Sequence, residues 1–282
     1  MRKIVRILVP VLCVLTMSTA VFGQERTGSW TMLRADEAGK VHFTVVQRHE
    51  RGTTRNGTDW PVTAFQGLDL ATRARHDVTL TIARDAGRFD GEGYLEDGEG
   101  AGVLKFTPDP AFVRAMSDVG FGGIDDDEQF AMALHDVSLD FARQMKSENL
   151  RGLDSDKLIA FRIFGVSQEF IRELRSAGLT ATDADKLVAF RIHGVSSAAV
   201  REFRRARIDA DEDELIAFQI HGVSPEFVAE LERLGYANVE PDDLVAMRIH
   251  GVTPQFISDM QSRGLKDLSV DKLVALRIHG IN

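Results

Sequence analysis

The chain has 282 residues with 43 acidic and 34 basic side chains, so its formal net charge at neutral pH is −9. This acidic balance argues against binding to a nucleic-acid backbone, which requires clustered lysines and arginines. The single cysteine, Cys13, lies in an apolar N-terminal segment. The rest of the chain can therefore form neither an internal disulfide nor a cysteine metal site.

Residues 1–23 have the layout of a cleavable secretory signal. Three basic residues within the first six precede an apolar run, and small residues follow it. We expect cleavage after Ala20 or Gly23 and export to the periplasm or the extracellular space. The alternative is an uncleaved membrane anchor, although the apolar run is shorter than the ~20 residues that span a bilayer. No later segment has the length and apolar character of a membrane span.

Residues 24–108 are predicted to form a small antiparallel β domain. Apolar and polar residues alternate around Phe43 and Leu80, as they do in strands with one buried face. Turns rich in Asp and Gly divide residues 77–107 into a three-stranded meander. Residues 50–59 are polar, and we interpret them as a mobile loop. A sandwich and a half-open barrel are both compatible with this pattern.

Residues 109–282 carry an internal repeat. A segment similar to Asp-Lys-Leu-Val-Ala-Phe-Arg-Ile-His-Gly-Val-Ser recurs every 28 or 29 residues. Its glycine falls at Gly165, Gly194, Gly222, Gly251 and Gly280. Shifting the register back by one period includes residues 110–145, which gives six copies of each of two short helices. A lone unit cannot bury its apolar faces whereas stacked neighbours can, so we predict an α-solenoid and an overall α+β fold.

The repeat contains clear helix boundaries. The first helix of each unit is predicted to begin at Asp125, Asp154, Asp183, Asp211, Glu240 and Ser269, and the second after Ser138, Ser167, Ser196, Ser224 and Thr253. The first helix is apolar almost all round, which predicts burial on several sides, whereas the second is amphipathic and lies outside. Glycine or asparagine ends most of the second helices. Arg207 is the exception, beside a loop one residue short, and we expect a local distortion there.

The last repeat ends at Gly280 without a second helix. This arrangement predicts an uncovered apolar flank around Leu273 and Leu276. We expect this end to dock on a protein partner, on a second copy of the chain or on the β domain. A monomer in which both leucines are covered from within would contradict that expectation.

Three segments resemble modules of known proteins. They are Gly-Arg-Phe-Asp-Gly-Glu-Gly-Tyr at 87–94, Gly-Ala-Gly-Val-Leu-Lys-Phe-Thr-Pro at 100–108, and the copies of Leu-Val-Ala-Leu-Arg-Ile-His-Gly. They resemble modules of exported bacterial repeat proteins and of the extracytoplasmic side of antibiotic-sensor-type transmembrane metallopeptidases. The resemblance covers most of residues 77–282 and implies a sensing or protein-contact role. The peptidase part is missing, and His49-Glu50 lacks the second histidine that a zinc peptidase helix needs.

Histidines recur at one position of the repeat, at His135, His193, His221, His250 and His279. Zinc ligands must converge within a few ångströms of one ion, since each Zn–N bond is ~2.0–2.1 Å long. Equivalent positions of stacked repeats lie farther apart, at the ~8–10 Å spacing of packed helices. We therefore interpret the histidines as helix-end residues that interact with terminal carbonyls, and we expect no metal or other cofactor.

Arginines recur beside the core at Arg162, Arg191, Arg248 and Arg277. We expect them to bury their aliphatic stems and to pair with helix-start aspartates of a neighbouring repeat. The alternative is a stripe that binds an anionic ligand. No arrangement of residues predicts a catalytic site.

Two classes of function are therefore open. The favoured one is a non-enzymatic exported scaffold whose helical surface binds a protein or a peptide. The alternative is an enzyme or a small-ligand sensor with a cleft between the β domain and the solenoid, near Trp60 or Tyr94.

Overall fold

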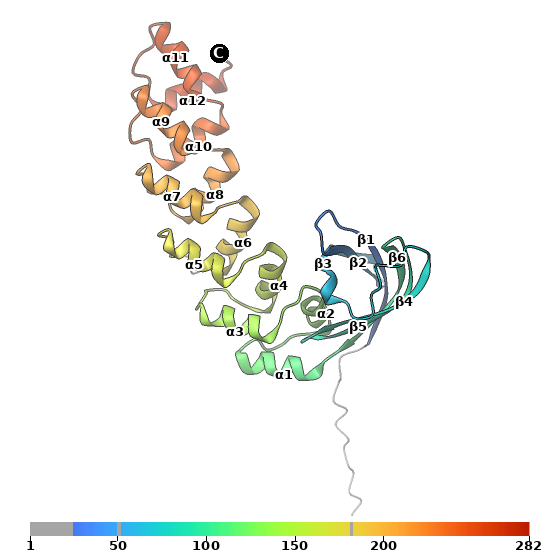
Figure 1. Cartoon of the computed structure of the whole chain (residues 1–282). Helices are drawn as coiled ribbons and strands as arrows, with labels where there is room; N and C mark the ends of the chain where they lie inside the picture. The colour runs from blue at the N-terminus through green and yellow to red at the C-terminus, as the bar shows by residue number, and fades with distance from the viewer. Residues whose placement is uncertain (1–24, 50–51, 181–182, 282) are drawn as a thin grey trace, which may run out of the picture.

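The computed structural model of the chain describes residues 25–49, 52–180 and 183–281. The predicted signal segment, with Cys13, lies outside the described residues. A six-stranded antiparallel sheet is followed within these ranges by twelve α-helices, which confirms the predicted α+β fold (Figure 1). No helix of the described part has the length and apolar character needed to cross a membrane.

The strands are β1 (Arg26–Arg34), β2 (Lys40–His49), β3 (Gly52–Pro61), β4 (His76–Arg84), β5 (Gly87–Glu96) and β6 (Glu99–Pro108). Their order in the sheet is β3-β2-β1-β6-β5-β4, so β3 and β4 are the two edges. The predicted meander is β4-β5-β6. The interpretation as a mobile loop was wrong for residues 52–59, because β3 pairs with β2 along its whole length, whereas residues 50 and 51 lie outside the described residues. Trp60 is the only buried residue among the described side chains of this edge strand, so the strand shows no apolar alternation.

The sheet curls around an aromatic core. Trp30 of β1 stacks on Phe43 of β2, with ring centroids 5.9 Å apart, and Phe65 meets Phe43 edge-on at 5.1 Å. Phe65 follows a short 3₁₀ helix, η1 (Val62–Ala64). The next residue, Gln66, exchanges backbone hydrogen bonds of 2.8 and 2.9 Å with Thr81 of β4. The segment after β3 therefore spans the gap to the opposite edge, which gives a half-open barrel.

The helices form two rows (Figure 1). The inner row consists of α2 (Asp126–Leu134), α4 (Ser155–Phe164), α6 (Ala184–His193), α8 (Glu212–His221), α10 (Pro241–Ile249) and α12 (Val270–Ile278). The outer row consists of α1 (Pro110–Val119), α3 (Leu139–Ser147), α5 (Gln168–Ser176), α7 (Ser197–Arg205), α9 (Pro225–Arg233) and α11 (Pro254–Ser262). Each inner helix contacts the next inner helix. Together the rows make an arm whose inner row lies on the side of the sheet.

The predicted helix caps are all present. The caps of the inner helices fall at the six predicted residues, and five of them accept a backbone hydrogen bond through their side chains. Glu240 does not. The distortion expected at Arg207 is absent, because Arg207 adopts the left-handed conformation of the equivalent glycines (φ 59°) and keeps their hydrogen bonds. The position thus places a side chain in a conformation that favours glycine.

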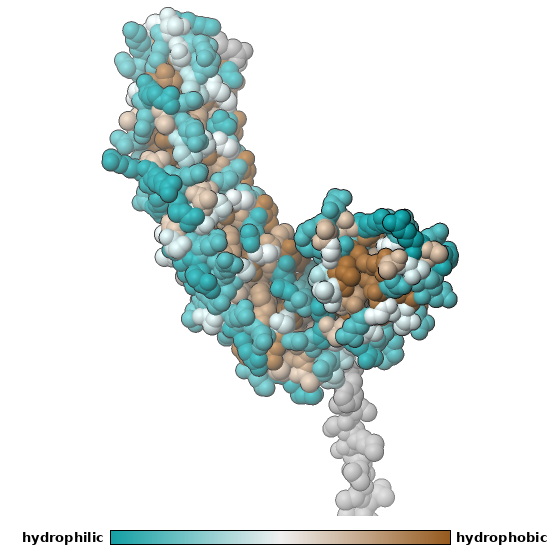
Figure 2. Space-filling view, in the orientation of Figure 1, coloured by the Kyte–Doolittle hydropathy of each residue, from teal (hydrophilic) through white to brown (hydrophobic). Residues whose placement is uncertain are grey.

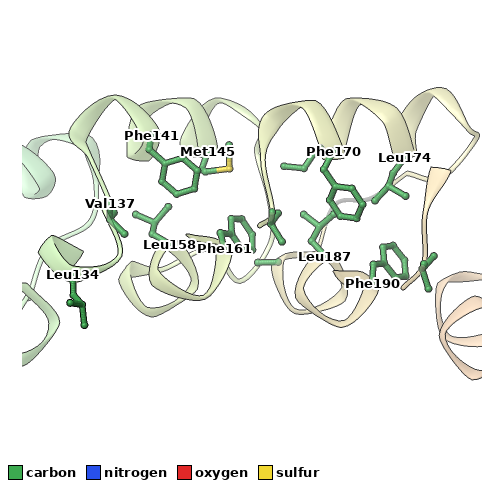
Figure 3. Packing of buried hydrophobic residues seen from close by; sticks show 14 of the residues in the cluster. Leu134, Val137, Phe141, Met145, Leu158, Phe161, Phe170, Leu174, Leu187 and Phe190 are labelled. Atoms are coloured by element: carbon green, nitrogen blue, oxygen red, sulfur yellow. The ribbon is translucent and has the colours of Figure 1, made fainter. Parts of the chain in front are cut away.

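A continuous apolar layer separates the two rows (Figure 3). Phe141 and Phe170 point from outer helices toward Leu158, Phe161 and Leu187 of the inner row, all three of which are fully buried. Buried residues of the sheet and of the helices belong to one cluster. Stacking of neighbours thus supplies the burial that a lone repeat lacks.

The last inner helix is covered only in part. Leu273 is fully buried, whereas Leu276 is partly exposed. The residues at the position of Leu276 in earlier repeats, Phe190, Phe218 and Met247, are fully buried. The expected open flank is therefore confined to the side of α12 that includes Leu276.

Candidate functional site

The first inner helix, α2, fixes the arm to the sheet. Its Phe130 ring lies edge-on to Phe89 and Phe106 of the sheet, at centroid distances of 5.6 and 5.1 Å. Gln129 is 3% exposed, and its Nε2 donates hydrogen bonds of 2.8 Å to the carbonyls of Ala86 and Asp109. Both donors of this buried amide are used, and the neighbouring rings are packed. The contact between α2 and the sheet, which we call the joint, therefore has one defined geometry.

A pocket of about 370 Å³ lies at this joint. Its polar lining comes from Thr58, Asp59, Arg84, His135, Asp136 and Arg162, and its apolar lining includes Trp60, Leu134 and Ile163. Strands β3 and β4 therefore form one wall, and α2 and α4 form the other. This is the cleft between sheet and solenoid that the sequence predicted as an alternative site.

Two arginines share one carboxylate in the pocket. Arg84 Nε lies 3.3 Å from Asp136 Oδ1, and Arg162 Nη2 lies 2.7 Å from Asp136 Oδ2. The Arg84 guanidinium also lies over the Trp60 ring, 4.8 Å from its centroid. Arg84 Nε is shielded from solvent and has no hydrogen-bond partner among the described residues. Burial lowers the pKa of Arg84, nearby Asp136 opposes that shift, and Arg162 adds to it.

His135 joins the same pocket. Burial, with a further contribution from the positive charge of Arg162, lowers the pKa of its imidazole below the usual value of 6.5. The ring therefore favours its neutral form. Asp136, the next residue, holds a left-handed backbone (φ 56°) where later repeats have glycine.

Tyr94 does not belong to this pocket. It borders a separate depression with Leu33 and Asp97 on the sheet, and Arg75 lies over its ring at 3.7 Å from the centroid. Of the two aromatic residues singled out in the sequence, only Trp60 lines the junction.

The repeated arginines make a contact that the sequence analysis did not predict. Arg162, Arg191 and Arg248 donate from Nε to the carbonyls of His135, Gly165 and His221, at 3.1, 2.9 and 3.3 Å. They and Arg277 also lie over phenylalanines of the preceding outer helix, at 4.1 to 5.1 Å from the ring centroids.

The expected pairing with helix-start aspartates was wrong for Arg162, Arg191 and Arg248. An arginine near the end of one inner helix lies beside the end of the previous inner helix, where carbonyls lack partners. Lysines make the predicted pairs instead, since Lys157 Nζ lies 2.7 Å from Asp185 and Lys186 pairs with Asp213.

The repeated histidines lie at the ends of the inner helices, as predicted, each one residue before the glycine or aspartate with a left-handed backbone. Within the described ranges, no group of three or more His, Cys, Asp and Glu side chains is arranged to hold a metal ion.

The inner helices expose an isoleucine at one repeated position. These residues, which we call the isoleucine ladder, are Ile163, Ile192, Ile220, Ile249 and Ile278, and their exposed fractions are 51, 53, 52, 54 and 58%. The inner helices are buried on several sides, as predicted, but the face that carries the isoleucines is exposed. Each isoleucine lies two residues after the core position that Phe190 occupies in α6, a rotation of ~200° around the helix axis, so it points away from the outer row.

Partly buried aliphatic residues widen the ladder. They lie one helical turn earlier, at Ile159, Val188, Ile216, Val245 and Val274. In Figure 2, hydrophobic side chains gather along the edge of the arm that faces the sheet. Aligned exposed isoleucines of this kind typify a contact surface more than scattered surface residues do.

Negative charge lies at the other end of the inner helices. The caps and first turns of α8 and α10 contain seven carboxylates, Asp211, Glu212, Asp213, Glu214, Glu240, Asp242 and Asp243, whereas Arg248 is the only arginine or lysine in these two helices. The middle of the arm thus combines an aliphatic surface with an acidic border.

No protein-family model matches the chain, and no curated protein matches it significantly. The residues themselves therefore carry the functional interpretation. The described surface offers two arrangements with distinct chemistry. The isoleucine ladder can bury the apolar face of a partner, and the junction pocket presents guanidinium groups to a small polar group.

Proposed function

We propose that this protein is a non-enzymatic, exported scaffold that binds a protein partner along the isoleucine ladder. The observation that carries the proposal is the half-exposure of the same aliphatic residue in five successive repeats. Burial of apolar surface stabilises association by roughly 25 cal/mol per Å² removed from water, before the costs of ordering the partner. A row of such side chains thus supplies an extended contact without a deep pocket.

The spacing of the ladder favours an α-helical partner. Packed helices lie ~8–10 Å apart, so successive isoleucines recur at about that distance along the arm. Seven residues of an α-helix rise about 10.5 Å. A helix lying along the arm with one apolar residue per heptad would therefore meet one isoleucine after another, in the manner of helix-in-groove recognition.

The charge of the surface favours basic residues on the partner. The seven carboxylates at the starts of α8 and α10 border the aliphatic surface, and the whole chain carries a net charge of −9. Complementary charges accelerate encounter and disfavour wrong partners. The proposed partner segment is therefore a basic amphipathic helix.

Export rests on residues 1–23, whose basic, apolar and small-residue regions follow the order of a secretory signal. The periplasm or the extracellular space is then where the partner is met. The resemblance to extracytoplasmic sensor modules agrees with this location and with a contact role.

The test compares charged substitutions on the two faces of the arm. Ile220→Asp with Ile249→Asp removes two members of the ladder, and both side chains are already half-exposed, so the fold should persist. Ala198→Asp with Ala229→Asp places the same charges on exposed positions of the outer row. Affinity capture from the producing cells should retain a partner with the outer variant and lose it with the ladder variant. Equal retention by both variants would refute the proposal.

A further inference from the structure

We propose that the junction pocket is a binding site for a carboxylate group, provided by a small organic acid or by the free C-terminus of a peptide. This proposal goes beyond the scaffold function and does not require the isoleucine ladder.

The pocket contains an unsatisfied hydrogen-bond donor, the Nε of Arg84. Arg84 is largely buried, with 16% of its side chain exposed, yet its Nε has no hydrogen-bond partner within the described part of the chain. Its contact with Asp136 is an ion pair of 3.3 Å, too long for a strong charged hydrogen bond. A buried donor without a partner is costly, and a ligand oxygen that accepts from it removes that cost.

Two guanidiniums of the pocket share a single carboxylate. Asp136 is the shared partner of Arg84 and Arg162, so the two guanidiniums exceed their common carboxylate by one positive charge. The other acidic side chain of the lining, Asp59, is already bonded through Oδ1 to His42 Nδ1 at 2.8 Å. Among the described residues, Asp59 thus pairs with His42 and forms no ion pair with Arg84 or Arg162, which share Asp136 alone. A ligand carboxylate would give the two guanidiniums a second anionic partner. The lowered pKa of Arg84 agrees with this, because burial and Arg162 both disfavour its charged form.

The shape of the pocket also suits a carboxylate. The planar guanidinium presents its donors as a fork that matches the two oxygens of a carboxylate. The cation is held in place on one side by the Trp60 ring. A cavity of about 370 Å³ admits a small acid or one terminal residue, and Leu134 and Ile163 provide apolar walls for its carbon atoms. Ile163 is also the first member of the isoleucine ladder, so a peptide with its C-terminus in the pocket would continue along the arm.

The test is a titration of the purified protein with three probes at constant ionic strength: sodium acetate, the tripeptide Ala-Ala-Leu with a free C-terminus, and the same tripeptide with a C-terminal amide. Tryptophan fluorescence is the readout, because Arg84 lies over Trp60 and the chain has only two tryptophans. We expect a saturable change with the two carboxylate probes and none with the amide. Tighter binding of the free-acid tripeptide than of acetate, by about tenfold or more, would identify a peptide C-terminus as the source. Equal binding would identify a small acid.

Variants locate the site. Arg84→Lys and Arg162→Lys should each weaken binding by about tenfold or more, because a lysine cannot replace the fork of donors. Arg191→Lys is the matched control, since Arg191 has the equivalent position one repeat later but does not line the pocket. If Arg84→Lys does not fold, Arg162→Lys and the NMR shift of the Arg84 Nε–H signal on addition of acetate carry the test. Absence of saturable binding by either carboxylate, equal binding of the amide, or unchanged affinity in both pocket variants would overturn the proposal.

Discussion

The guanidinium of Arg191 lies 4.1 Å from the centroid of the Phe170 ring and donates from Nε to the carbonyl of Gly165 at 2.9 Å. One side chain of α6 thereby contacts both the outer helix α5 and the end of the inner helix α4. The same contacts recur at Arg162 and Arg248. These arginines therefore join consecutive repeats and help to fix the angle between them.

Replacement of Arg191 should weaken this joint. We expect Arg191→Ala to lower the free energy of unfolding by about 1–2 kcal/mol, since it removes a charged hydrogen bond to a carbonyl and a cation–π contact. Arg172→Ala, on an exposed position of α5, is the control and should change stability by less than ~0.5 kcal/mol. Urea unfolding followed by circular dichroism measures both. If both substitutions lowered the free energy of unfolding equally, the contacts of Arg191 would not stabilise the arm.

Arg207 offers a gain in stability. It has a positive φ of 59° at a position where four other repeats have glycine and one has Asn149, and a left-handed conformation costs a non-glycine residue about 1–2 kcal/mol. Glycine loses more backbone entropy on folding, so Arg207→Gly should stabilise the protein by only about 1 kcal/mol. The converse change, Gly178→Ala at φ 98°, should destabilise it by a similar amount. A loss of melting temperature in Arg207→Gly would contradict this interpretation.

The open flank of α12 predicts unequal costs for equivalent truncations. Met247→Ala removes a fully buried side chain and should lower the free energy of unfolding by about 2–5 kcal/mol. Leu276→Ala removes a side chain that still contacts water, so its cost should be smaller. Chemical denaturation of the two variants makes the comparison. A cost for Leu276→Ala as large as that for Met247→Ala would show that this flank is covered in solution, for example by a second copy.

His135 predicts a pH dependence of stability. Its pKa is lowered by burial and by Arg162, so the unfolded chain binds this proton more readily than the folded protein. The neutral ring therefore makes its whole contribution to the free energy of unfolding above the unfolded-state pKa of about 6.5. That contribution is lost as the pH falls through the folded-state pKa. Between about pH 7.5 and 5, the melting temperature of His135→Gln should fall less than that of the unchanged protein. His193→Gln, at the exposed equivalent position, is the matched control, and an equal effect of both substitutions would contradict the assignment to His135.

The repeat made most of the helical arm predictable from the sequence. Caps such as Asp154 and Ser167 depend on local hydrogen bonds, so their residue types and spacing are sufficient to place the helices. Strand β3 was missed because, among its described side chains, only Trp60 is buried, so the strand lacks the apolar alternation that marks the others. The partner of Arg191 was missed because it lies in the preceding repeat, and the angle between repeats is set by packing.

The isoleucine ladder shows a different limit. The repeated Arg-Ile-His sequence was visible, but Ile192 looked like one more core residue in a short apolar helix. Only its angle relative to Phe190, and the location of the outer row, show that it faces solvent. The junction pocket likewise depends on contacts between Arg84 and Asp136, which lie far apart in the sequence.

The most direct test of the scaffold function is photo-crosslinking from single positions in the producing cells. A photoreactive benzoylphenylalanine would replace Ile192, Ile220 or Ile249 of the ladder and, as controls, Ala198 or Ala229 of the outer row. We predict that the ladder positions crosslink to one partner polypeptide, within a basic amphipathic segment identified by mass spectrometry, and that the outer positions do not. Crosslinks equally frequent from both faces, or absent from all three ladder positions, would contradict the account.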